Sequence, residues 1–107
     1  MPAVKEKPVY QDEQLRIEFH ASEEYFLYLK DKTGEERGHF LPRGVLQELA
    51  QTKRGGIERK LFNSNERLLD AIKREGISVD SLHVAFCQAY IEDERRRAEY
   101  VSKMMNV

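Results

Sequence analysis

The sequence predicts an α+β fold in which a three-stranded antiparallel β-meander is followed by two short helices and a long C-terminal helix. Alternating apolar and polar residues, rich in β-formers, occupy roughly residues 10–41, which is the pattern of half-buried strands. Helix caps and helical spacings of apolar residues follow. From Val79 to about Met105 no residue breaks the helical pattern, so the last helix is expected to be long.

The composition is that of a single globular domain with a modest core. The chain has 107 residues, of which 40% are apolar and 35% charged. Residues 1–9, with Pro2 and Pro8, are expected to form a flexible arm before one domain over residues 10–107. The sequence shows neither a signal peptide nor an apolar run long enough to span a membrane, and its single cysteine cannot form an internal disulfide. We therefore expect a cytoplasmic protein.

The strand region contains a hairpin whose pairing can be predicted. "LRIEFHA" alternates like a half-buried strand, and "EYFLYLK" has β-formers on both faces, as a central strand does. In "DKTGEER", Gly34 is expected to take the left-handed conformation after a type I turn. That turn pairs Lys30 with Glu36, Tyr28 with Gly38, and Phe26 with Phe40. The register of the first two strands is not predicted.

The helical region is divided by identifiable caps. Pro42 suits the first position of a short helix that ends at "RGG". Asn63 and Glu66 have the spacing of a capping box, which predicts the start of a second short helix that ends at Gly76. Ser78 is expected to cap the last helix.

The last helix is expected to have two different halves. Its first half carries two apolar stripes and can contact two surfaces, whereas beyond Ile91 only a narrow seam remains. The members of this seam alternate in three- and four-residue steps, as in a coiled coil. The seam, which is the predicted partner interface, consists of Val84, Cys87, Ile91, Glu94, Ala98, Val101 and Met105.

Glu94 is the polar member of this seam. It is expected to set the register and to need a cation such as Arg95 or Arg97 of a second chain. Three uses of the seam stay open: packing within the subunit, self-association, and docking onto a different protein. A narrow stripe on a charged helix has little to bury against its own small domain. The predicted function is therefore a small non-enzymatic protein-interaction or regulatory module that forms a homodimer, with parallel and antiparallel pairing both open.

A helix-turn-helix motif is one nucleic-acid alternative. "REGISVDSLHVAF" contains the glycine turn of that motif. Helices that read DNA usually present arginine, lysine, asparagine or glutamine to base edges, yet no lysine or arginine lies between Gly76 and Arg95. Two amphipathic helices joined by a tight turn are the favoured interpretation.

Binding of single-stranded nucleic acid is the second alternative. Aromatic side chains beside cations can stack unpaired bases, and a basic loop follows the first predicted helix. The net charge of −1 argues against it, because non-specific nucleic-acid binding depends on positive charge. The residues of this alternative surface are Lys53, Arg54, Arg59, Lys60, Phe26 and Tyr28.

No catalytic residue, metal site or cofactor is predicted. His83 and Cys87 lie four residues apart on one helix face, a spacing that can hold zinc or copper when two more ligands are present. The sequence indicates neither such ligands nor a group that would orient a His–Cys catalytic pair. A cysteine on an apolar stripe usually packs as a small hydrophobic residue. The neighbouring carboxylates of Asp93 and Glu94 are expected to be solvated.

Overall fold

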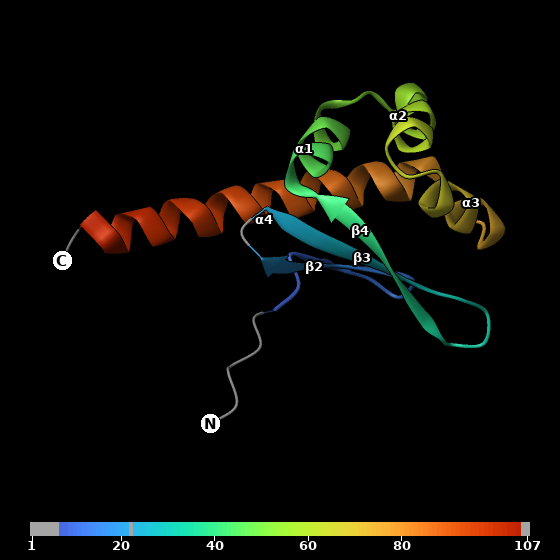
Figure 1. Cartoon of the computed structure of the whole chain (residues 1–107), viewed down its shortest axis with the longest axis horizontal. Coiled ribbons are helices and arrows are strands. Elements are labelled where there is room, and N and C mark those ends of the chain that lie inside the picture. The colour runs from blue at the N-terminus through green and yellow to red at the C-terminus, as the bar shows by residue number, and fades with distance from the viewer. Residues whose placement is uncertain (1–6, 22, 106–107) are drawn as a thin grey trace.

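The computed structural model, which describes residues 7–21 and 23–105, contains a four-stranded antiparallel sheet followed by helices (Figure 1). The strands are β1 (Tyr10–Gln11), β2 (Leu15–Ala21), β3 (Glu24–Lys30) and β4 (Glu36–Pro42), and they are arranged in that order. The α+β class is confirmed, but the sheet has one strand more than predicted. The additional strand, β1, pairs Tyr10 with Ile17.

The predicted β3–β4 hairpin is confirmed residue by residue. Lys30 pairs with Glu36, Tyr28 with Gly38, and Phe26 with Phe40. Gly34 has a φ of +86°, a conformation that glycine adopts without steric cost. The turn is also held by the Asp31 carboxylate, which accepts a hydrogen bond from the Thr33 backbone at 2.8 Å.

The helical part contains one more helix than predicted. Its elements are α1 (Arg43–Gln51), the 3₁₀ turn η1 (Arg54–Gly56), α2 (Ile57–Ser64), α3 (Glu66–Arg74) and α4 (Val79–Met105). The expected capping box at Asn63 is wrong, because that residue lies within α2. Instead, Asn65 caps α3 by accepting a hydrogen bond from the Leu68 backbone at 3.1 Å. The Ser78 cap is confirmed by a hydrogen bond from the Ser81 backbone at 3.1 Å.

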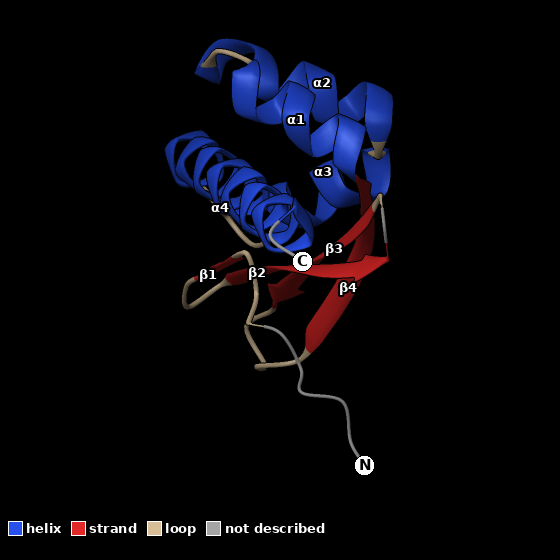
Figure 2. Ribbon diagram, turned by 90° about the vertical axis from the view of Figure 1, so that its left-hand side faces the viewer, coloured by secondary structure: helices blue, strands red, loops and turns tan. Residues whose placement is uncertain are grey.

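The helices cover one face of the sheet and leave the other open (Figure 2). Tyr25, Leu27 and Leu29 alternate along β3 and point into the core, where helix residues such as Leu46 and Phe86 meet them. Side chains at alternate positions face solvent, so Phe26 and Tyr28 are only half-buried. Among the described residues, no helix is both long and apolar enough to cross a bilayer.

The N-terminal boundary of the domain lies earlier than predicted. Val9, assigned above to a flexible arm, is 6% exposed and donates a backbone hydrogen bond to the Ile17 carbonyl at 2.9 Å. Residues 1–6 of the expected arm lie outside the described residues.

Candidate functional site

The C-terminal half of α4 extends beyond the rest of the domain. The first half packs on the core through a buried stripe, and the second half runs past the end of the sheet (Figure 1). The buried stripe ends at Asp93, and the described residues after Arg97 are all exposed. The helix therefore presents about two turns that its own subunit does not cover.

Most of the predicted seam lies on the solvent-exposed side of α4. The exposed fractions are 46% for Val84, 67% for Ile91, 53% for Val101 and 79% for Met105, and Ala98 is also exposed. These residues share one side of α4, because seven residues make almost two complete turns. That side lies roughly opposite the buried stripe. Intramolecular contacts of the seam are made by Cys87 and Glu94.

Two seam members contact α1. Cys87 is half-buried, and its Sγ lies 3.4 Å from the Ala50 carbonyl oxygen. Glu94 accepts a hydrogen bond from Arg43 Nη2 at 2.8 Å, so its cation comes from its own chain, whereas we had expected a second subunit to supply it. The hydrogen bond from Tyr90 and the positive charge of Arg43 lower the pKa of the Glu94 carboxyl. Neither Cys87 nor Glu94 requires a partner to be satisfied.

Two further apolar residues were missed by the seam pattern. Tyr100 and Met104 are 65% and 59% exposed, and they continue the core-facing side of α4 beyond the sheet. Tyr100 borders a hollow of about 490 Å³ between α4 and the end of the sheet, which Phe19 and Tyr25 also line. The apolar surface at the end of α4 is therefore wider than the seam alone.

A buried polar cluster fixes the point where α4 leaves the domain. Asp93 is 2% exposed, so the expectation that it is solvated is wrong. Its carboxylate accepts hydrogen bonds from Arg43 Nε at 2.8 Å, from Arg97 Nε at 3.0 Å and from the Tyr25 hydroxyl. Burial raises the pKa of the Asp93 carboxyl, and the hydrogen bond from Arg97 opposes this shift. The cluster joins β3, α1 and α4 and sets the direction of the projecting helix.

A second ionic group ties the N-terminal segment to α4. Glu92 pairs with Arg95 and Arg96, each with an N–O distance of 2.7 Å. Arg96 also donates to the backbone carbonyls of Lys7 at 2.8 Å and Pro8 at 3.2 Å. Hydrogen bonds from Arg95 and then Arg96 lower the pKa of Glu92 to about 2.

The Glu92 group predicts an acid-dependent contribution to stability. Because its carboxyl is more acidic in the folded chain, its contribution is complete above the ordinary pKa of 4.5 and is lost as the pH falls towards about 2. A Glu92→Gln variant lacks this pH-dependent contribution to stability. Denaturant unfolding of both proteins should give free energies that differ most near neutral pH and converge in acid. A difference that is independent of pH would contradict the assignment.

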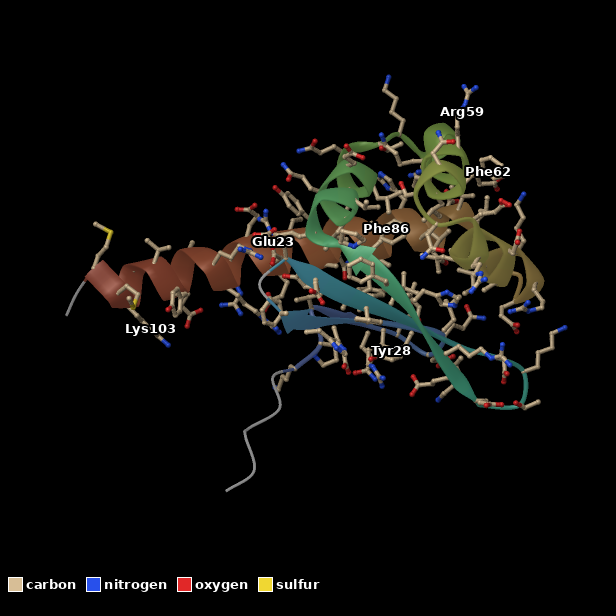
Figure 3. The ribbon with its side chains drawn as sticks, in the orientation of Figure 1. Glu23, Tyr28, Arg59, Phe62, Phe86 and Lys103 are labelled. Carbon is tan, nitrogen blue, oxygen red and sulfur yellow. The ribbon has the colours of Figure 1, made fainter. Side chains whose placement is uncertain are left out.

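The residues of the nucleic-acid alternative are not brought together. Figure 3 shows Arg59 on the helical side of the molecule and Tyr28 on the open face of the sheet. Two cations of the basic loop are engaged within the chain, Arg54 with Asp80 at 3.0 Å and Lys60 with Glu48 at 3.3 Å. Lys53 is exposed near them, whereas Phe26 lies beside Tyr28. A single surface combining these aromatics and cations is therefore absent.

The His83 and Cys87 side chains do approach each other, with Nε2 and Sγ 3.7 Å apart. In residues 7–21 and 23–105 no group of three or more histidine, cysteine or acidic side chains is placed to hold a metal ion. The α3–α4 turn has the expected glycine, since Gly76 has a φ of +70°. The first turns of α4 expose Asp80, Ser81 and Val84, which offer no cation to a phosphate backbone.

No protein-family model, curated protein or solved structure matches the chain. The geometry of α4 and the chemistry of its exposed residues are therefore the features that bear on function.

Proposed function

We propose that the chain is a small, non-enzymatic cytoplasmic protein-interaction module that forms a homodimer through the C-terminal half of α4. One observation carries this proposal: the helix projects from the domain with Ile91, Val101 and Met105 more than half exposed. An apolar stripe of this kind loses its contact with water when a second helix packs against it. A regulatory role would follow if the two domains act together only when paired.

A second copy of α4 fits the stripe because Ile91, Ala98 and Met105 are evenly spaced along it. Ala98 lies seven residues after Ile91 and seven residues before Met105. An antiparallel pair with Ala98 at the crossing point packs Ile91 against Met105 of the partner subunit. By symmetry, Met105 packs against Ile91 of the partner subunit. The small Ala98 side chain allows the two backbones to approach closely where they cross.

The charges also favour the antiparallel arrangement. A parallel pair would place Glu94 against Glu94 of the partner subunit, and like charges at a helix interface are unfavourable. In the antiparallel pair, the acidic segment around Glu92 lies beside Lys103 of the partner subunit. The charged residues that flank the seam then complement each other.

The contact is expected to be modest in strength. The paired segment, residues 91–105, is roughly 22 Å long at 1.5 Å per residue. It buries less surface than a standard interface, so we expect a dissociation constant on the order of micromolar. The dimer should accordingly form and dissociate within a normal range of protein concentrations.

Sedimentation of wild type and Ala98→Glu at several concentrations tests the proposal. The wild type should shift from monomer to dimer with concentration, and the variant should remain monomeric because it places two glutamates opposite each other at the crossing point. Gln88→Glu is the matched control, since it adds the same charge at an exposed position of α4 outside the paired segment. It should dimerise like the wild type. A wild type that stays monomeric at high concentration would exclude self-association.

A further inference from the structure

The β4 strand forms a free edge of the sheet (Figure 2). Asp31 donates a backbone hydrogen bond to the Glu35 carbonyl at 2.9 Å, and hydrogen-bonded positions alternate along an antiparallel pair. The backbone groups of Glu36, Gly38 and Phe40 therefore point away from β3. Within the described residues, the one hydrogen bond recorded to these outward groups is from Asn65 Nδ2 to the Phe40 carbonyl, at 3.2 Å. The rest of the edge can accept another strand.

A polar groove of about 200 Å³ lies beside this edge, between β4 and α3. Arg37 and His39 enter it from β4, and Arg74 enters it from the last turn of α3. The Ala71 methyl group forms part of its wall, and this small side chain leaves room between the strand and the helix. A strand added to β4 would direct every second side chain into this groove.

The acids that line the groove are already engaged, whereas two of its nitrogen-bearing side chains are not. The Asp31 carboxylate holds the hairpin turn through Thr33, and Glu75 pairs with Arg74 at 3.3 Å. In the part of the chain that the structure describes, no ion pair is recorded for Arg37, and His39 Nε2 is buried without a hydrogen-bond partner. A buried polar nitrogen without a partner is costly, so an acceptor entering the groove would be stabilised.

We propose that the β4 edge and this groove bind an extended, acidic peptide segment of a partner protein by strand addition. Backbone hydrogen bonds to Glu36 and Gly38 supply affinity, as in other strand-addition complexes. A carboxylate of the peptide enters the groove and accepts hydrogen bonds from Arg37 and His39. Side chains at alternate positions lie on the open sheet face, where Phe40 is 46% exposed and packs against Phe26. The preferred segment thus alternates acidic and apolar residues.

His39 provides a direct readout of this binding. Burial and the nearby charges of Arg74 and Arg37 lower the pKa of the His39 imidazole. A carboxylate bound between Arg37 and His39 adds a negative charge and must raise that pKa again. A role limited to packing would leave the titration of His39 unchanged when a peptide is added.

The test uses the 107-residue chain and the end-blocked peptide Thr-Val-Glu-Val-Thr as the probe. NMR measures the hydrogen exchange of the Gly38 and Phe40 amides and the pKa of His39. We expect the peptide to slow both exchange rates and to raise the pKa. The same peptide with glutamine in place of glutamate should slow exchange less and leave the pKa unchanged. A peptide N-methylated at its three central residues should neither slow exchange nor raise the pKa of His39, because its central residues cannot donate backbone hydrogen bonds to β4.

Variants of the groove complete the experiment. Arg37→Gln should weaken binding of the glutamate peptide about tenfold, which corresponds to about 1.4 kcal/mol for a lost charge-assisted hydrogen bond. Lys53→Gln, which removes the same charge from an exposed site on the helical side, should have no effect. Unchanged exchange and an unchanged His39 pKa at millimolar peptide would overturn the proposal. Equal effects of the N-methylated peptide would also overturn it, since strand addition would then not be required. Neither result depends on pairing through α4.

Discussion

Asp93→Ala is expected to lower the free energy of unfolding by about 3 kcal/mol, the lower end of the range for a broken buried ion pair. The substitution removes the shared acceptor of Arg43, Arg97 and the Tyr25 hydroxyl. The loss stays at the lower end because the Arg43 and Arg97 side chains are 17% and 36% exposed and can turn towards water. Denaturant unfolding monitored by circular dichroism measures the change.

Glu94→Ala is the matched control, because both carboxylates bind Arg43. The Glu94 side chain is 51% exposed, so its ion pair is largely solvated and its removal should cost much less stability than the removal of Asp93. Equal losses of unfolding free energy for the two variants would mean that Asp93 does not anchor α4 to β3 and α1. A large difference would identify Asp93 as the residue that fixes where the projecting helix points.

The β3–β4 hairpin could be predicted to the residue because all of its determinants are local. Gly34 sets the turn, and the turn then fixes which residues lie opposite each other. The strand β1 could not be predicted, because two residues are too few to show alternation. The helix α2 was also missed, since its two buried residues, Ile57 and Leu61, follow a Gly–Gly sequence that suggested a loop.

The buried polar cluster was missed for a different reason. Asp93 is separated from Tyr25 by 68 residues and from Arg43 by 50 residues. The burial of an acid depends on partners that only the tertiary fold brings together, and adjacent carboxylates in a charged segment carry no sign of it. The signal that could have helped is the position of Asp93, which continues the buried stripe of Leu82, Phe86 and Ala89 at helical spacing.

The exposure of the seam could be predicted for its outer residues and not for its inner ones. The apolar residues near the end of α4 exceed what a small domain can cover, and the structure leaves Val101 and Met105 exposed. Cys87 and Glu94 belong to the same seam by spacing, but α1 contacts both. The path of α1 over α4 is a property of the tertiary packing that the seam pattern does not contain.

Ending the chain at Arg97 is expected to abolish dimerisation and to leave the domain folded. The deletion removes Ala98, Val101 and Met105, which lie in the C-terminal half of the paired segment. The truncated protein should therefore sediment as a monomer at every concentration. The free energy of unfolding should change by less than about 1 kcal/mol, because exposed side chains contribute little to stability. Sedimentation and denaturant unfolding of the same preparation measure both quantities.

The two measurements together separate the possible roles of the end of α4. A truncated chain that still dimerises would place the contact elsewhere on the molecule and contradict the pairing about Ala98. A truncated chain that loses several kcal/mol would show that the end of α4 packs on its own subunit, for example through Tyr100 in the hollow beside Phe19. A stable monomer is the result that pairing through α4 requires, because a surface kept for a partner contributes to association and not to folding.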